Sequence, residues 1–102
     1  MEELDLIKTL LERVGARDIE IFDLKNTHPL FDFVIVATAD SLRQAEGFAA
    51  YIKEESKNGL EVKNVEGKDT GWLLIDLNGI VIHVFTPENR EFFDLDSIYQ
   101  DK

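Results

Sequence analysis

The sequence predicts a single-domain α/β protein of the α+β kind, with two helices on one face of a mixed five-stranded sheet, in the order α-β-β-α-β-β-β-α. The 102 residues, of which 44% are hydrophobic, suffice for one core but not for two. Two segments place their apolar residues at helical spacing, and five shorter ones have the composition of strands. We therefore expect one domain over residues 1–102, with the second face of the sheet mostly uncovered.

The best-defined element is a hairpin over residues 71–87. Asn78-Gly79 joins two apolar runs and is the dipeptide that best tolerates positive φ at both centres of a type I′ turn. In this register one face is aliphatic and pairs Leu73 with Val84, Ile75 with Ile82, and Leu77 with Ile80. The opposite face, the mixed face, pairs Trp72 with Phe85, Leu74 with His83, and Asp76 with Val81. Either the mixed face is functional, or a C-terminal helix covers part of it.

The first half of the chain predicts a helix and two strands. Apolar residues at helical spacing indicate an amphipathic helix from Glu2 to Val14, which Gly15 ends. The alternation in residues 18–24 predicts a strand with one wet face. His28, in the following loop, has no second ligand nearby and is interpreted as an exposed loop residue. Residues 31–38 are apolar on both alternations, which predicts a strand inside the sheet.

The second half predicts a helix, an edge strand, the hairpin and a C-terminal helical segment. Asp40 or Ser41 is expected to cap a helix that runs to about Lys57 and ends at Asn58-Gly59. Residues 60–66 predict a short edge strand, and residues 67–71 resemble a phosphate loop but are too short for one. After Pro87, one or two helical turns carry apolar side chains that either close the core or edge the mixed face: Phe92, Phe93, Leu95, Ile98 and Tyr99.

Composition limits the partners. With 21 acids against 11 bases, the net charge of −10 disfavours attraction to nucleic-acid phosphates through the bulk field. A basic partner suits this charge, although acids also serve solubility alone. The absence of cysteine excludes disulfides and thiol catalysis. No apolar run approaches the roughly 18 residues of a membrane span, and the N-terminus lacks signal features, so we expect a cytoplasmic protein.

No group of residues predicts an enzyme. Asp94 and Asp96 are two residues apart in a helical turn, so helix capping explains them better than a shared magnesium ion. Asp76 and His83 share the mixed face, but the diagonal between their Cα atoms spans about 7–8 Å, and no nucleophile completes a triad. The residues favour an interaction module over an enzyme, with no metal or cofactor expected.

Two long segments carry a family resemblance. FDFVIVATADSLRQAEGFAAYI and VEGKDTGWLLIDLNGIVIHVFTPENREFFDLDSIY resemble the ribosomal silencing factor family, also called the Iojap-related family, and the resemblance runs from about Asp18 to Tyr99. Its motifs are S-x-R-Q at a helix start, W-x-x-x-D in a strand, and H-V-F-x-P-E-x-R at a turn. The resemblance implies a fold similar to nucleotidyltransferases without their metal-binding acids. It further implies a translation repressor that binds a ribosomal protein of the large subunit and blocks subunit joining when nutrients are short.

The family motifs assign binding roles to Trp72, Asp76, His83 and Arg43, although Arg43 could equally be a solvated residue. The complete expected binding set is Arg43, Trp72, Leu74, Asp76, His83, Phe85, Glu88, Arg90, Phe93 and Tyr99. Ala39-Asp40 departs from the family pattern, where glycine and a small polar residue are usual. We expect a basic ribosomal protein as partner, no sequence-specific nucleic acid and no membrane, and a monomer or weak homodimer. The alternative is a nucleotidyltransferase-like enzyme that retains nucleotide binding.

Overall fold

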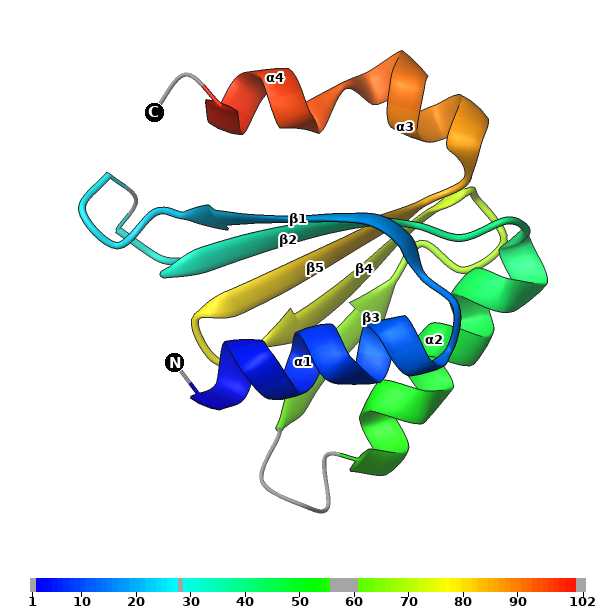
Figure 1. Ribbon diagram of the computed structural model, residues 1–102, viewed down its shortest axis with the longest axis horizontal. Coiled ribbons are helices and arrows are strands. Elements are labelled where there is room, and N and C mark those ends of the chain that lie inside the picture. The colour runs from blue at the N-terminus through cyan, green and yellow to red at the C-terminus, as the bar shows by residue number, and fades with distance from the viewer. Residues whose placement is uncertain (1, 28, 56–60, 101–102) are drawn as a thin grey trace.

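The computed structural model describes residues 2–27, 29–55 and 61–100 (Figure 1). In chain order its elements are α1 (Glu2–Arg13), β1 (Arg17–Asp23), β2 (Phe33–Thr38), α2 (Leu42–Glu55), β3 (Val62–Glu66), β4 (Trp72–Leu77), β5 (Ile80–Phe85), α3 (Pro87–Phe93) and α4 (Leu95–Gln100). The predicted fold class and order are confirmed. The expected C-terminal helix is two helices, because Asp94 adopts a left-handed conformation (φ +47°) at the end of α3.

The five strands form one mixed sheet in the order β1-β2-β5-β4-β3. β2 and β5 run parallel, and every other neighbouring pair is antiparallel. The hairpin register is confirmed, since Trp72 lies opposite Phe85 and Leu74 lies opposite His83. β3 lies at one edge and β2 inside the sheet, as predicted. The register places alternate residues of β4 and β5 on opposite faces.

The predicted type I′ turn is wrong, because Gly79 has a positive φ (+78°) and Asn78 does not. The carbonyl of Gly79 accepts hydrogen bonds from the backbone N–H groups of Asp32 (2.7 Å) and Phe33 (3.2 Å). The turn is therefore held against the entrance of β2. A tertiary contact of this kind sets a turn geometry that the dipeptide alone cannot reveal.

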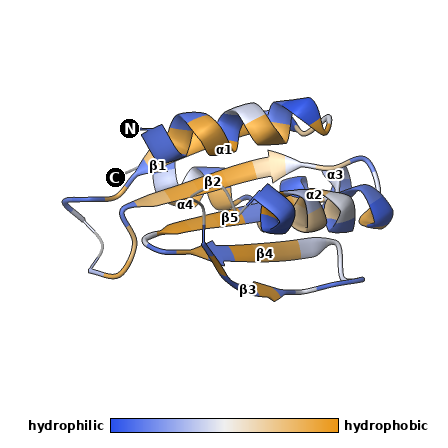
Figure 2. Ribbon diagram, turned by 90° about the horizontal axis from the view of Figure 1, so that it is seen from below, coloured by the Kyte–Doolittle hydropathy of each residue, from blue (hydrophilic) through white to orange (hydrophobic). Residues whose placement is uncertain are grey.

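Helices α1 and α2 cover the aliphatic face, and Figure 1 shows them together on one side of the sheet. The apolar stripes of both helices are buried against the strands (Figure 2). From the helices this core includes Leu4, Ile7, Leu10, Leu11, Ala45, Phe48, Ala49 and Ile52. Helix α1 ends one residue earlier than predicted. Ser41 rather than Asp40 caps α2, since its hydroxyl accepts the N–H of Gln44 at 3.0 Å. The predicted end of α2 at Lys57 to Gly59, and His28, lie outside the described residues.

The expectation that the mixed face is mostly uncovered is wrong over β1, β2 and β5. Helices α3 and α4 lie on that side of the sheet (Figure 1). Beneath them is a second core of Leu24, Val34, Val36 and Phe85, against which Phe22, Trp72, Leu95 and Tyr99 pack. Each short helix contributes one or two large apolar side chains. These few large side chains let the short helices α3 and α4 cover a larger area of the sheet than the length of the helices suggests.

Arg90, from α3, holds the two C-terminal helices in place. Its Nη1 donates to the carbonyl of Asp18 (2.6 Å) and to the hydroxyl of Thr38 (2.9 Å). Its Nε and Nη2 donate to the two carboxylate oxygens of Asp96 in α4, at 3.0 and 2.8 Å. The side chains of Arg90 and Asp96 are only 15% and 22% exposed. One guanidinium thus ties α3 to α4 and both to the ends of β1 and β2, in the bidentate geometry that makes such pairs strong.

We expect Arg90→Met to lower the free energy of unfolding by about 2 kcal/mol, because the largely buried Asp96 loses its charged partner. Amide hydrogen exchange should accelerate in α3 and α4 and stay slow in α1 and α2. Arg17→Met is the matched control. It removes the ion pair of Arg17 with Asp40, whose side chains are 51% and 59% exposed, so the stability should change by less than about 1 kcal/mol. Equal effects of the two substitutions would contradict this role of Arg90.

Candidate functional site

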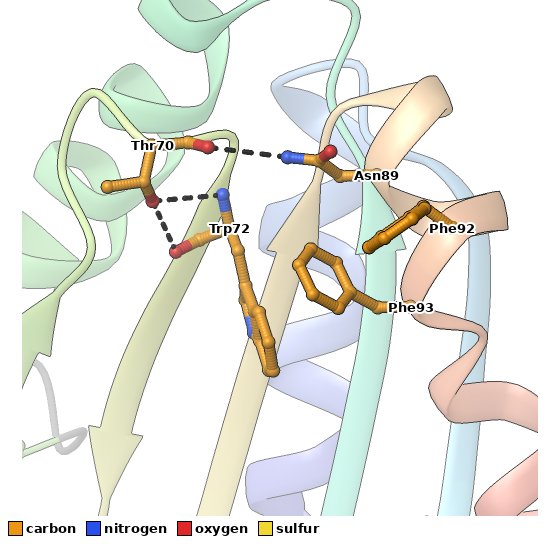
Figure 3. Close-up of a pocket in the computed structure, with 5 residues that line it drawn as sticks. All are labelled: Thr70, Trp72, Asn89, Phe92 and Phe93. Atoms are coloured by element: carbon orange, nitrogen blue, oxygen red, sulfur yellow. Dashed lines mark hydrogen bonds between the residues drawn. The ribbon is translucent and has the colours of Figure 1, made fainter.

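The exposed part of the mixed face contains a hollow that we call the aromatic cleft. It is lined by Thr70, Trp72, Asn89, Phe92 and Phe93 and has a volume of about 450 Å³ (Figure 3). Phe92 is 78% exposed and Phe93 is 38% exposed, although both are large apolar side chains. Exposed aromatic rings gathered beside a hollow are typical of a protein-binding surface.

Hydrogen bonds to backbone groups hold the segments around the aromatic cleft in place. The hydroxyl of Thr70 accepts the backbone N–H of Trp72 (3.2 Å), and the side-chain amide of Asn89 donates to the carbonyl of Thr70 at 3.3 Å (Figure 3). The N–H of Thr86, just before α3, donates to the carbonyl of Gly71 at 3.1 Å. Pro87 then starts α3, where a missing N–H costs nothing. The start of α3 is therefore fastened to the loop that enters β4.

Trp72 is held from three directions and is half-buried. Its ring centroid lies 4.6 Å from that of Phe93 and 5.1 Å from that of Phe85. Its indole Nε1 donates a hydrogen bond to Nδ1 of His83 at 2.9 Å. Because these contacts leave the indole one orientation, little conformational entropy remains to be lost when a partner covers it.

His83 supports Trp72 from within the protein. Burial lowers the pKa of His83 to about 4, so the ring is neutral at pH 7. A neutral ring leaves Nδ1 free to accept the indole N–H, which places the remaining proton on Nε2. The histidine side chain is 8% exposed, whereas Phe85 is fully buried. Trp72 and Phe93 pack against Phe85, so the structure does not expose this residue for the direct partner contact that the sequence led us to expect.

A second hollow, the sheet groove, continues along the mixed face and has a volume of about 290 Å³. It brings together four of the expected binding residues, Leu74, Asp76, His83 and Tyr99. Phe31, Val34, Glu66 and Val81 complete its lining. Leu74 and Asp76 alternate with buried residues of β4, so they point to this side of the sheet. The groove offers apolar walls with the carboxylates of Asp76 and Glu66, a combination that suits an apolar side chain beside a basic one.

Three expected residues lie elsewhere. Arg43 is exposed on α2 and lines a different hollow, between α2 and β3. Arg90 is engaged in the internal contacts with Asp18, Thr38 and Asp96. Glu88 is exposed in the first turn of α3 and lines none of the hollows described above. The expected binding residues are therefore divided between the mixed face and the hollow between α2 and β3, and Arg90 makes an internal structural contact instead.

Sequence reasoning left Phe92, Asn89 and Thr70 out of the binding set. Phe92 was recognised as a C-terminal aromatic, but the register of a seven-residue helix cannot tell which of two adjacent phenylalanines faces the sheet. Their ring centroids lie 5.0 Å apart in an edge-to-face arrangement. The sequence did not indicate that Asn89 and Thr70 line the cleft, because this depends on a hydrogen bond between residues that are 19 positions apart.

The described ranges 2–27, 29–55 and 61–100 contain no group of three or more histidine, aspartate or glutamate side chains placed to hold a metal ion. Within these ranges, no helix combines the length and apolarity needed to cross a membrane. In the aromatic cleft, the polar groups of Thr70 and Asn89 are engaged in hydrogen bonds to backbone groups.

Comparisons with known proteins agree on one family. The profile of the family described as "ribosomal silencing factor during starvation" matches residues 1–102. The ribosomal silencing factor of Bacillus subtilis is 32% identical, over 84% of this chain and 75% of that protein. The one from Chromobacterium violaceum is 33% identical, over 87% of this chain and 75% of that protein. The mouse protein named mitochondrial assembly of ribosomal large subunit protein 1 is 27% identical, over 95% of this chain but 45% of its own length.

Solved structures show the same architecture. A crystal structure of a Chromobacterium violaceum protein superposes with a TM-score of 0.89 at 31% identity, and the match covers 97% of this chain and 84% of that one. A protein from Bacillus halodurans gives a TM-score of 0.83 at 27% identity, over 96% of this chain and 93% of that one. Sequence and fold agree over nearly the whole length. The chain belongs to the ribosomal silencing factor family.

Proposed function

We propose that this chain represses translation by binding the large ribosomal subunit through the aromatic cleft and the sheet groove, so that the small subunit cannot join. The observation that carries the proposal is the exposure of Phe92 and Phe93 beside a rigidly held Trp72. Family membership supplies the ribosome as the target. The mouse relative, named for assembly of the large subunit, supports this subunit as the one that is bound.

The aromatic cleft would supply most of the affinity. Large aromatic rings at the centre of an interface are the usual hot spots, because they fill apolar pockets from which water is excluded. Phe92 projects from α3 with most of its ring in water, while Trp72 forms the opposite wall (Figure 3). A partner that inserts an apolar side chain between Trp72 and Phe92 removes that side chain and both rings from water, and the Trp72 ring needs no further ordering.

Charge favours a basic ribosomal protein as the partner. The net charge of −10 and the carboxylates of Asp76 and Glu66 at the sheet groove would attract a basic surface and orient it. In this account the protein acts in the cytoplasm as a binding module and catalyses no reaction. A retained nucleotidyltransferase-like activity would instead show as saturable, magnesium-dependent binding of nucleoside triphosphates. Calorimetry with each triphosphate separates the two functions.

We expect Phe92→Ala to weaken binding to isolated large subunits by about thirty-fold, roughly 2 kcal/mol, with little change in melting temperature. The side chain is 78% exposed, so its removal costs the free protein little. Cosedimentation with separated subunits at near-physiological salt measures the binding. Trp72→Ala is a less decisive variant, because the indole also packs on Phe85 and Phe93.

Leu30→Ala is the matched control for Phe92→Ala. Leu30 is 75% exposed, and it lies in the loop between β1 and β2 rather than in either hollow. This substitution should leave cosedimentation with large subunits unchanged. Equal binding by wild type and Phe92→Ala would show that the aromatic cleft does not contact the subunit. Failure of the wild type to cosediment with large subunits would overturn the proposed function itself.

The burial of His83 predicts a pH dependence of stability. The pKa of His83 is about 4 in the folded protein and near 6.5 when unfolded, so between these values the unfolded chain binds more protons. The free energy of unfolding therefore has its full value, as far as His83 is concerned, above about pH 6.5. It decreases as the pH falls toward 4, by at most about 3 kcal/mol. Thermal melting of wild type and His83→Gln from pH 7.5 to 4 should show a steeper fall for the wild type. Parallel curves would refute this role of His83.

A further inference from the structure

A third hollow, the basic groove, lies between α2 and β3. Its main part has a volume of about 440 Å³, and a shallower extension of about 200 Å³ continues along β3. Four cationic side chains line the two parts: Arg43 and Lys53 from α2, Lys63 from β3 and Lys68 from the loop before β4. Lys53 and Lys68 line both parts. Within residues 2–27, 29–55 and 61–100, these four cationic side chains gather at one groove.

That concentration stands out against the charge of the whole protein. The sequence has only 11 lysines and arginines against 21 aspartates and glutamates, yet four of the 11 lie around this groove. Among the described residues that line the groove, Glu46 is the one carboxylate. The hydrogen bond that protonated Glu46 donates to the carboxylate of Asp69 raises the pKa of Glu46, and the negative charge of Asp69 raises it further. Four cationic side chains therefore stand against Glu46 in the lining and Asp69 beside it, which leaves an excess of positive charge at the groove.

The floor of the groove is built from small residues. Gly47, Ala49 and Ala50 of α2 lie between the cations. A Cβ added at Gly47 would meet no atom within 4 Å, so the surface is open there. A bulky, regularly charged chain can approach such a floor closely, with cations on both sides of it. This shape and charge suit a phosphate backbone, whose negative charges repeat every few ångströms.

The basic groove lies on the α2 side of the sheet, and a narrow crevice at its rim shares residues with both the groove and the aromatic cleft. Glu46, at its rim, shares a crevice with Asp69, Gly71 and Trp72, and Trp72 is a wall of the aromatic cleft. The loop that carries Lys68 and Thr70 therefore separates two neighbouring hollows with different chemistry. A large partner that covers the aromatic cleft would bring its adjoining surface next to the groove.

We propose that the basic groove contacts the phosphate backbone of ribosomal RNA beside the protein that the aromatic cleft binds. This inference rests on the proposed function. A net charge of −10 repels free nucleic acid at long range, whereas fields at physiological salt decay within about 8 Å. The groove therefore contributes once docking has placed it within that distance. It fixes the orientation of the protein on the subunit and discriminates no RNA sequence.

The test is the salt dependence of binding to large subunits between 50 and 300 mM potassium chloride. Each phosphate contact adds about 0.7 to 0.9 to the steepness of the plot of log affinity against log salt. Lys53→Gln/Lys68→Gln should therefore flatten that plot by about 1 to 2. Lys8→Gln/Arg13→Gln is the control, since it removes the same charge from exposed positions on α1 and should leave the slope unchanged. Equal slopes for the groove variant and the wild type would overturn the proposal.

A second experiment distinguishes a failure of the groove proposal from a failure of the proposed function. Binding of a short RNA duplex at about 20 mM salt, measured by fluorescence anisotropy, should be weak for the wild type and at least several-fold weaker for the groove variant. If the wild type fails to bind large subunits but shows this difference, the proposed function fails and the groove survives. Equal binding of the duplex by the wild type and the groove variant would overturn the groove proposal. So would displacement of the duplex by polyglutamate at equal charge concentration, because the groove would then prefer an acidic protein segment.

Discussion

The position of α3 and α4 on the sheet depends on the guanidinium group of Arg90. Arg90 ties α3, α4 and the ends of β1 and β2 together through four hydrogen bonds, in a region where the two C-terminal helices bury no residue completely. Helices this short are not stable by themselves and need tertiary contacts. Their position decides that Phe85 is covered and that Phe92 is exposed. The arrangement of the aromatic cleft therefore follows from a charged contact at its side rather than from the aromatic residues themselves.

The two faces of the hairpin have different tasks because side chains of a strand alternate. The aliphatic side of β4 and β5 is sealed by α1 and α2 and supplies the stability of the domain. The mixed side is only partly covered, and there Trp72 is fixed by His83, Phe85 and Phe93 while its outer edge borders the cleft. A rigid aromatic surface on a stable sheet needs little reorganisation on binding. Acidic groups line the sheet groove on the mixed face, and cationic groups line the groove between α2 and β3 on the other side of the sheet.

Local periodicity predicted the parts of the fold that local physics decides. The helical stripes, the strand order along the chain and the hairpin register follow from spacing, and all three are confirmed. The type I′ turn and the bare mixed face were wrong, because contacts of Gly79 with Asp32 and of Arg90 with Asp18 join distant segments. At the site, alternation along β4 and β5 correctly grouped Leu74, Asp76 and His83. It could not show that Phe85 is buried, that Phe92 is exposed, or that Arg43 faces a different hollow.

Docking of the mixed face on the large ribosomal subunit can be followed at one residue. The chain has a single tryptophan, and it lies at the junction of the aromatic cleft and the sheet beneath it. Incorporation of 5-fluorotryptophan gives one ¹⁹F resonance that reports the surroundings of Trp72 alone. Its titration with separated subunits tests this docking most directly. The account predicts that large subunits shift or broaden the resonance at stoichiometric amounts and that small subunits leave it unchanged. An unaltered resonance in the presence of saturating large subunits would contradict the account.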